Sequence, residues 1–316
     1  MTRRRALVAV GAAVTLVLAG LALRTLDLGE VAGAIAAMRP VWLLPSLALL
    51  AVAVAIRVVR WRVLFVPATR PPLGDVAHAL LVGLFFNCVL PLRAGEAARI
   101  LVLNRRAGTS RSQILGTVAV ERIYDVVALL LLLLVALPWL PDVTWLRTAA
   151  WLGGAAGLAA AVAVVALALD ARRATRVVLW PLALLPFVTA ERRELAAENL
   201  AAGLAGFRDA RAALSGFALT VASWLVFALS FWMLTFGFEL DLGPGAGLLT
   251  LVATGLGMAV PSGPAALGVF EAAVVVALAP FGVPAEQAVS YGLVLHAVNL
   301  VPYLACGVLL LAPGRR

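Results

Sequence analysis

The sequence predicts an all-α integral membrane protein. Hydrophobic residues make up 64% of the 316 residues and the mean hydropathy is +1.05, whereas a soluble domain averages nearer ~45–50% apolar residues. All 25 basic residues are arginines, and most of them stand at the ends of long apolar runs, as the positive-inside rule predicts. Composition and charge pattern together indicate a chain that crosses the bilayer several times.

About six runs reach the length of ~20 mostly apolar residues that a spanning helix requires. They are Ala6–Leu23, Val41–Ile56, Ile114–Leu137, Trp145–Leu169, Ala213–Phe236 and Gln287–Leu311. The first run follows three arginines and so resembles a signal peptide, but it is long and has no clear small-residue cleavage site. We therefore interpret it as a retained helix.

Two further apolar regions are broken. Val76–Leu103 is interrupted by Pro91-Leu-Arg-Ala-Gly95, and Ala246–Ala279 is interrupted by Pro261-Ser-Gly-Pro-Ala265 and again at Gly268. Each half is too short to span alone, and non-helical backbone at membrane depth is tolerated only where protein buries it or it lines a cavity. We expect two re-entrant, broken-helix hairpins.

The arginine distribution predicts a multi-pass cell-membrane protein with both termini in the cytoplasm. If both broken regions re-enter, most arginines are cytoplasmic, including Arg57 and Arg60 after the second run, and only Arg24, Arg39 and Arg147 lie outside. A full double crossing in place of either hairpin leaves the same sidedness, so charge does not separate these two cases.

The order of predicted elements repeats within one membrane domain, residues 1–316. A helix, a broken hairpin and a helix occupy residues 41–137 and recur over 213–316, after an N-terminal helix and outer segment at 1–40 and a connection at 138–212. The first hairpin enters from inside and the second from outside, which is the inverted repeat typical of transporters. Any pair of interrupted helices gives the same pattern, so that alternative stays open.

Residues 170–212 form the polar part of that connection. Leu195, Leu200, Leu204 and Phe207 recur there at roughly helical spacing among charged residues, which predicts an amphipathic helix on the membrane surface. A connector packed on the bundle and a partner-binding segment are both consistent with this pattern.

The first cluster of embedded charges lies at the first break. Arg93, Glu96 and Arg99 have the spacing i, i+3, i+6, which places them on roughly one side of a helix. Ionisable residues at membrane depth are costly, and they are functional candidates by default. Asn87 precedes the break and joins the candidate site, although hydrogen bonding to freed backbone groups is the favoured reading for it.

A second cluster, Glu121, Arg122 and Asp125, lies inside the apolar run that begins at Ile114. Glu121 and Asp125 share a helix face, and Arg122 can pair with Asp125 one turn on. A sparser third set consists of Glu271 after the second break and of His296 and Asn299 in the last helix. His296 is either a proton relay or a satisfied core histidine.

The embedded arginines indicate an anionic ligand. The planar guanidinium fork binds phosphate bidentately, so Arg93, Arg99 and Arg122 are the expected phosphate contacts. The carboxylates either neutralise these arginines in the empty state or carry coupling protons. The alternative is a network of salt bridges that only holds the helices together.

Other functional classes find less support in the sequence. Cys88, Cys306, His78 and His296 are too scattered for a metal site, so no metal or cofactor is expected. Ser262 has no general base at recognisable spacing, and enzyme activity is not predicted. The net charge of +9 is compatible with nucleic acid, but no basic face runs along a soluble element.

Two motifs carry a resemblance to a known family. Gly83-Leu-Phe-Phe-Asn87 with Leu90-Pro-Leu-Arg-Ala-Gly-Glu96 and Arg99, followed by Glu121-Arg-Ile-Tyr-Asp125, resembles the pattern of the lysylphosphatidylglycerol synthase transmembrane family, also called flippase-like. The Arg57–Trp61 segment and the Pro261–Glu271 segment are also similar. The resemblance covers nearly the whole chain, and the first two motifs together are specific.

The resemblance implies a relative of the lipid-translocating half of multiple peptide resistance factors, which flips aminoacylated phosphatidylglycerol. Other relatives are fused to glycosyltransferases that act on polyprenyl phosphates. We therefore expect a transporter of an anionic lipid or lipid-linked phosphate, with a glycosyltransferase or lipid synthase as a candidate partner. A non-transporting scaffold and an intramembrane lipid-phosphate transferase are the alternatives. The family commonly has arginine near position 296, so His296 makes the second-repeat site less basic.

Overall fold

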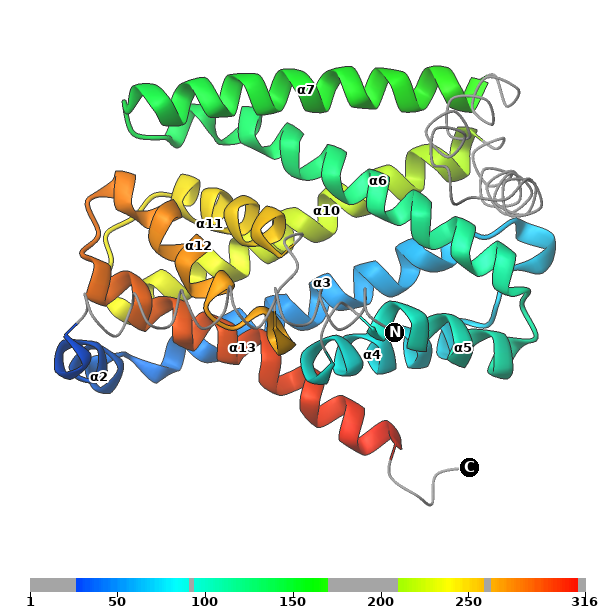
Figure 1. Ribbon diagram of the computed structural model, residues 1–316, viewed down its shortest axis with the longest axis horizontal. Coiled ribbons are helices and arrows are strands. Elements are labelled where there is room, and N and C mark those ends of the chain that lie inside the picture. Colours follow the sequence, from blue (N-terminus) through cyan, green and yellow to red (C-terminus); the bar gives the residue numbers. More distant parts are fainter. Residues whose placement is uncertain (1–26, 91–93, 170–209, 259–262, 312–316) are drawn as a thin grey trace, which may run out of the picture.

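The computed structural model describes residues 27–90, 94–169, 210–258 and 263–311, and these residues form helices with short connections (Figure 1). Several predicted features lie outside the described residues. They are the helix Ala6–Leu23, Arg93, the start of the second break at Pro261 and Ser262, and most of the polar connection 170–212.

Within each half of the chain, the described connections between helices are short, and the sequence encodes several of the helix ends. In the first half they are α2 (Leu28–Ala37), α3 (Leu43–Val63), α4 (Leu73–Val89), α5 (Gly95–Ala107), α6 (Arg111–Ala136) and α7 (Thr144–Leu169). In the second half they are α10 (Ala210–Thr235), α11 (Pro244–Gly257), α12 (Val269–Leu278) and α13 (Ala285–Leu311). The Ser110 side chain caps α6 by accepting from the Gln113 amide at 3.3 Å, and Gly108 ends α5 at φ 65°.

Within the described ranges, four helices are long and apolar enough to cross a membrane. They are Pro40–Val63, Thr144–Ala163, Arg211–Phe238 and Ala285–Leu311, and they confirm four of the predicted spans as helices of suitable length and composition. α6 is also one continuous helix of 26 residues, as predicted, and it carries three charged residues in its middle.

The first broken region is a hairpin of two packed helices. A Cβ atom on Gly95 would overlap the carbonyl oxygen of Gly83, so the close approach of α5 to α4 requires glycine at this point. The Gly95 amide donates to the Asn87 side-chain oxygen at 2.9 Å. The prediction that Asn87 satisfies a backbone group freed by the break is confirmed.

The second broken region has the same plan and a different break. α11 packs on α12, and the connection between them includes Ala265 and Ala266 at φ 55° and 56°. L residues with a side chain seldom adopt such angles, so this break is strained where the first is closely packed. Gly268, where a break was predicted, lies at φ 80° directly before α12.

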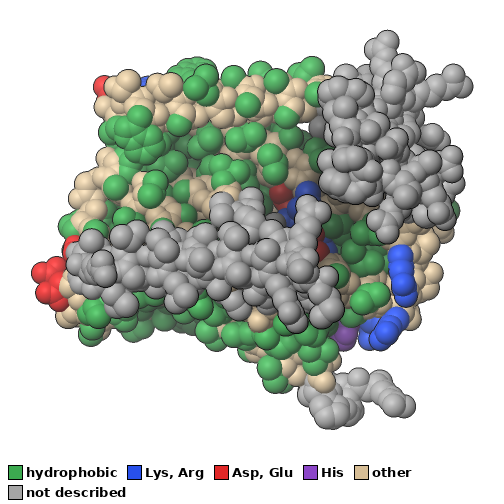
Figure 2. All heavy atoms as spheres, in the orientation of Figure 1, with side chains coloured by type: hydrophobic (Ala, Val, Ile, Leu, Met, Phe, Trp, Pro, Cys, Tyr) green, Lys and Arg blue, Asp and Glu red, His purple; other side chains and the backbone are tan. Residues whose placement is uncertain are grey.

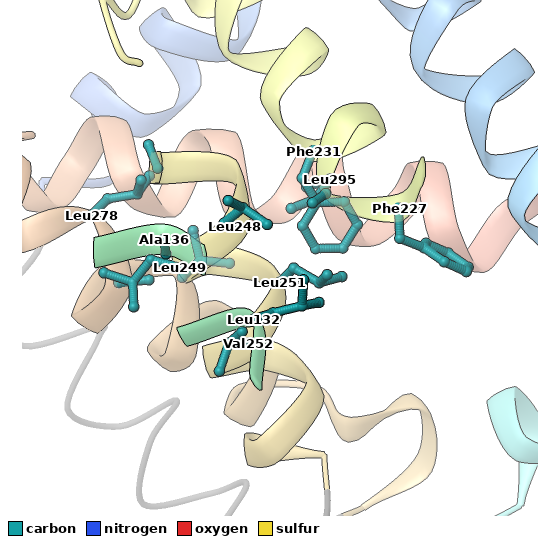
Figure 3. Packing of buried hydrophobic residues seen from close by; sticks show 14 of the residues in the cluster. Leu132, Ala136, Phe227, Phe231, Leu248, Leu249, Leu251, Val252, Leu278 and Leu295 are labelled. Atoms are coloured by element: carbon teal, nitrogen blue, oxygen red, sulfur yellow. The ribbon is translucent and has the colours of Figure 1, made fainter. Parts of the chain in front are cut away.

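Each broken hairpin packs against a long helix of the other half of the chain. α3 lies along α10 (Figure 1), α4 contacts α13, and α11 contacts α6, which α7 covers on its other side. The largest apolar cluster joins α6, α10, α11, α12 and α13 (Figure 3), with Leu132, Phe231, Leu251, Leu278 and Leu295 among its members. Large apolar side chains also stand on the outer surface, for example Leu44, Leu152 and Leu214, as expected of helices that face lipid.

Candidate functional site

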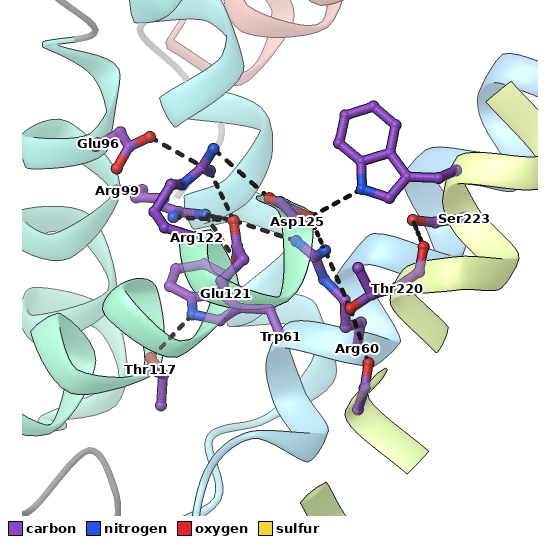
Figure 4. A network of polar contacts seen from close by, with 12 residues as sticks. Arg60, Trp61, Glu96, Arg99, Thr117, Glu121, Arg122, Asp125, Thr220 and Ser223 are labelled. Carbon is purple, nitrogen blue, oxygen red and sulfur yellow. Dashed lines mark hydrogen bonds and ion pairs between the residues drawn. The ribbon is translucent and has the colours of Figure 1, made fainter. Parts of the chain in front are cut away.

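Charged residues from α3, α5 and α6 meet in the interior of the bundle (Figure 4). We call this set the arginine–carboxylate network. Its members are Arg60, Glu96, Arg99, Glu121, Arg122 and Asp125. Five of them were predicted as site residues from the sequence, and the structure brings the two predicted clusters together.

Glu121 is the centre of the network. Its Oε1 atom accepts from Arg99 Nη1 and Nη2, both at 3.1 Å, and from Arg122 Nη2 at 2.9 Å. Arg60 Nη2 lies 3.2 Å from the same oxygen. Three guanidinium groups therefore share one carboxylate, which holds α3, α5 and α6 together.

Asp125 holds the other side of the network. It accepts from Arg60 Nη1 at 2.6 Å and from the indole N–H of Trp224 on α10 at 3.1 Å. Arg122 Nη1 lies 3.6 Å from its second oxygen, which confirms the predicted pairing one turn on. Arg60 Nη1 also contacts the Thr220 hydroxyl at 3.4 Å, so α10 is tied into the network as well.

The network has a buried part and an open edge. The side chains of Arg60 and Glu121 are 2% exposed and that of Arg99 is 4% exposed, whereas Arg122 is 42% exposed and its partner Glu96 is 24% exposed. Glu96 Oε1 and Arg122 Nη2 are 3.3 Å apart. Of the expected phosphate contacts, Arg122 is thus accessible, Arg99 is enclosed, and Arg93 lies outside the described residues.

Aromatic residues fix the arginines in place. The guanidinium carbon of Arg99 lies 4.8 Å from the ring centre of Trp61, whose indole N–H donates to the Thr117 hydroxyl at 3.1 Å. A cation over an indole face is stabilised by the ring quadrupole, by as much as ~2 kcal/mol when desolvated. Each of these contacts limits the ways in which the network can rearrange.

The prediction that Arg60 flanks the span, outside the helix bundle, is wrong, because it is only 1% exposed and pairs with both carboxylates of α6. The apolar run was taken to end at Ile56, but α3 continues to Val63. Arg57 and Arg60 are therefore helical residues one turn apart, and that spacing was the available signal. Trp224 gave no signal, since aromatic residues are common in membrane helices.

The structure also brings together Glu271 and His296 of the third predicted set, with no arginine paired to them among the described residues. Glu271 Oε1 lies 2.6 Å from His296 Nδ1, and Glu271 Oε2 accepts from the Gly268 amide at 2.7 Å at the start of α12. The imidazole stacks on Phe270 with ring centres 4.4 Å apart. Within the described ranges, the ion-pair partner of Glu271 is this histidine.

Comparison with known families decides what kind of protein carries this arrangement. Residues 8–307 match the family described as Lysylphosphatidylglycerol synthase TM region. The chain belongs to this family. The membership confirms the resemblance seen in the motifs, and the matched region includes every member of the arginine–carboxylate network. No curated protein and no solved structure matches the chain.

The chemistry open to this family member follows from the geometry. Arginine forks can exchange a carboxylate for a phosphate because both present paired oxygen acceptors. The Arg122–Glu96 pair is exposed enough for such an exchange, whereas the contacts around Glu121 are enclosed. The site therefore combines enclosed ion pairs around Glu121 with one partly exposed ion pair, Arg122–Glu96.

Proposed function

We propose that this membrane protein is a flippase-like transporter of an anionic lipid or a lipid-linked phosphate, and that it is not an enzyme. The observation that carries the proposal is the arginine–carboxylate network with its exposed edge at Arg122 and Glu96. Burying ionisable side chains inside an apolar bundle is expensive, and such groups usually mark a substrate pathway. Figure 2 is consistent with access, since charged side-chain atoms are visible within an otherwise largely apolar face.

In the proposed cycle a lipid phosphate competes with Glu96 for Arg122. Glu96 neutralises Arg122 in the empty site at 3.3 Å and is displaced when the phosphate binds. The buried carboxylates Glu121 and Asp125 keep the other guanidinium groups oriented throughout. Arg93 and Arg99 remain proposed secondary contacts, since their sequence position places them beside the same break.

The proposed mechanism also needs two access states. We place both termini in the cytoplasm of a cell membrane and assign α3–α6 and α10–α13 to inverted repeats. Packing supports this assignment, because α4 contacts α13 as α11 contacts α6, and α3 pairs with α10. If the two repeats are exchanged, the α4–α13 contact becomes the α11–α6 contact, and the α3–α10 contact maps onto itself. Such symmetry is expected of two repeats that move against each other in alternating access.

Proton coupling is assigned to the second hairpin. In that half, the described side chains of Glu271 and His296 are in direct contact, and one is a carboxylic acid while the other is an imidazole. Histidine changes charge in the physiological pH range, so proton transfer at this pair can report on, or drive, the position of α12.

The complete pairing of Glu121 with arginines inside the network also favours a second function. Glu121 already satisfies three arginines, which is what a rigid, non-transporting scaffold for a glycosyltransferase or lipid synthase would also need. Such a scaffold would make Arg122 and Glu96 dispensable for lipid movement.

Lipid movement in proteoliposomes distinguishes these proposals. Fluorescent phosphatidylglycerol is followed for Arg122→Gln, Glu96→Gln and the control Glu239→Gln, which removes one partner of an exposed ion pair with Arg39. Losing a charge-assisted contact of ~1.5–3 kcal/mol predicts that Arg122→Gln slows transport by about tenfold or more, while the control transports normally. Unchanged transport by a correctly folded Arg122→Gln protein would sink the site assignment and favour the scaffold.

A further inference from the structure

Arg57 is an embedded arginine that forms no direct ion pair with a described carboxylate, although Asp125 and Glu121 lie near enough to act on its charge. It lies on α3 one turn before Arg60, and its side chain is only partly exposed. In the described part of the chain its guanidinium packs against two aromatic rings, Trp224 and Phe227, and Tyr303 also lies near it. We propose that Arg57 is the primary binding residue for the phosphate group of the ligand. This inference rests on the function proposed above and identifies the residue that receives the anion first.

Around the network, the described arginines outnumber the described carboxylates by one. Among the described residues, Arg57, Arg60, Arg99 and Arg122 face three carboxylates. All three carboxylates are engaged at 2.6–3.3 Å by arginines other than Arg57. The arginine of this set without a direct ion pair is therefore Arg57, and a single bound phosphate would compensate the excess positive charge of the set.

The aromatic contacts leave part of the Arg57 guanidinium uncovered. Its central carbon lies 4.4 Å from the Trp224 ring centre and 4.3 Å from that of Phe227, while the two ring centres are 5.9 Å apart. With these three distances the rings form a corner around the cation and cannot lie on opposite faces of it. The guanidinium N–H donors are then held in place without being consumed, because ring faces offer no strong hydrogen-bond acceptor.

The position of this corner is fixed by the network. The Trp224 indole N–H donates to Asp125 at 3.1 Å, so the ring that supports Arg57 is anchored to the carboxylate that also receives Arg60. The Arg57 Nε atom is buried and has no hydrogen-bond partner among the described residues, a property that it shares with the Nε atoms of Arg60, Arg99 and Arg122. A buried, unpartnered charged donor costs free energy that binding an acceptor recovers.

Arg57 differs from the other arginines in the cost of accepting an anion. A phosphate that binds Arg99 or Arg122 must first displace Glu121 or Glu96. At Arg57 nothing of opposite charge has to leave, so the anion gains the contact without breaking an ion pair. The shared chemistry is a phosphate monoester or diester, from a phospholipid, a polyprenyl phosphate or free phosphate.

Ligand binding to the purified full-length protein tests this inference. Affinities for phosphatidylglycerol, undecaprenyl phosphate, phosphatidylcholine and inorganic phosphate are measured for wild type, Arg57→Gln and Arg105→Gln, the last being an exposed arginine at the end of α5. Arg57→Gln is expected to weaken binding of an anionic ligand by about tenfold or more, which corresponds to ~1.4 kcal/mol, while Arg105→Gln binds as wild type. The ligand that shows this loss identifies the phosphate source.

Equal affinity of wild type and Arg57→Gln for every probe would overturn the inference. If Arg57→Gln does not fold, Arg57→Met is read instead, because it removes the charge and keeps a long side chain beside the Trp224 and Phe227 rings; wild-type affinity of that variant would also overturn the inference. Lipid movement is scored separately. Arg57-dependent binding without movement defeats only the proposed transport, and movement with Arg57-independent binding defeats only this inference.

Discussion

The two broken hairpins of this protein have the same helical plan and opposite kinds of chemistry. The α4–α5 hairpin brings Glu96 and Arg99 to a network of fixed charges, whereas the α11–α12 hairpin presents Glu271 to a histidine. Arginine stays charged at every physiological pH, while histidine does not. From this difference we propose that the first hairpin binds the anion and that the second hairpin exchanges protons.

The largest effect is expected when Glu121 is replaced by glutamine. This carboxylate is 2% exposed and contacts Arg60, Arg99 and Arg122, so its loss leaves buried guanidinium groups without compensation. Breaking a buried ion pair costs ~3–5 kcal/mol, and we expect the free energy of unfolding to fall by about that amount. Reversible denaturation in mild detergent, followed by tryptophan fluorescence, measures the change.

Glu271→Gln is the matched variant in the second hairpin. Among the described residues, Glu271 contacts one side chain and one backbone amide donor, and glutamine can still satisfy these contacts in part. The expected loss is about 1–2 kcal/mol. Equal losses for the two variants would mean that the halves do not differ as described.

Much of this architecture was predictable because proline and glycine mark helix ends. Both breaks were located, and the pairing of Arg122 with Asp125 followed from helical spacing alone. The contact of Arg99 with Glu121 joins residues 22 positions apart on different helices. Such a contact depends on how α5 packs on α6, which local spacing does not determine.

The arginines of α3 were harder to predict for a physical reason. An arginine after an apolar run usually marks the end of a span, because its guanidinium reaches the aqueous interface. Here the opposing charges of α6 keep Arg60 inside the bundle. Only the partner helix, distant in sequence, distinguishes a flanking arginine from a buried one.

A smaller effect is expected from adding a methyl group at the glycines of the two hairpins. Alanine at Gly95 would collide with the backbone of Gly83 and the Asn87 side chain, whereas at Gly257 the nearest side-chain atom is Ala273 Cβ at 3.4 Å, an ordinary contact. Overpacking costs ~1–3 kcal/mol, so Gly95→Ala should lower the free energy of unfolding by at least that amount.

Gly257→Ala should change that free energy by less than about 1 kcal/mol, because alanine also has the higher helix propensity. Gly74→Ala is the control in the first hairpin, since nothing lies within 4 Å of the added atom. A Gly95→Ala protein as stable as the Gly74→Ala protein would show that the close packing of α4 and α5 is not needed.

The smallest effect concerns pH. If the Glu271–His296 pair exchanges protons, wild-type transport measured between about pH 5 and 8 should vary with pH. His296→Gln keeps a hydrogen-bonding side chain and should reduce that variation to less than about twofold across the same range. His78→Gln is the control, because it removes the other histidine, which lies near the start of α4. Retention of the full pH profile in His296→Gln would remove the proton role from the second hairpin.

The most direct test of the account compares two lipids in one preparation of proteoliposomes. Fluorescent phosphatidylglycerol and phosphatidylcholine are placed in both leaflets, and dithionite bleaching from outside reports how fast inner-leaflet lipid reaches the surface. Because the network and Arg57 are proposed to bind an anion whose charge is not compensated, phosphatidylglycerol should move about tenfold or more faster than in protein-free vesicles, and phosphatidylcholine should lag behind it. Movement of both lipids at the protein-free rate, or of both at the same raised rate, would contradict the claim that this protein transports lipids by their anionic phosphate.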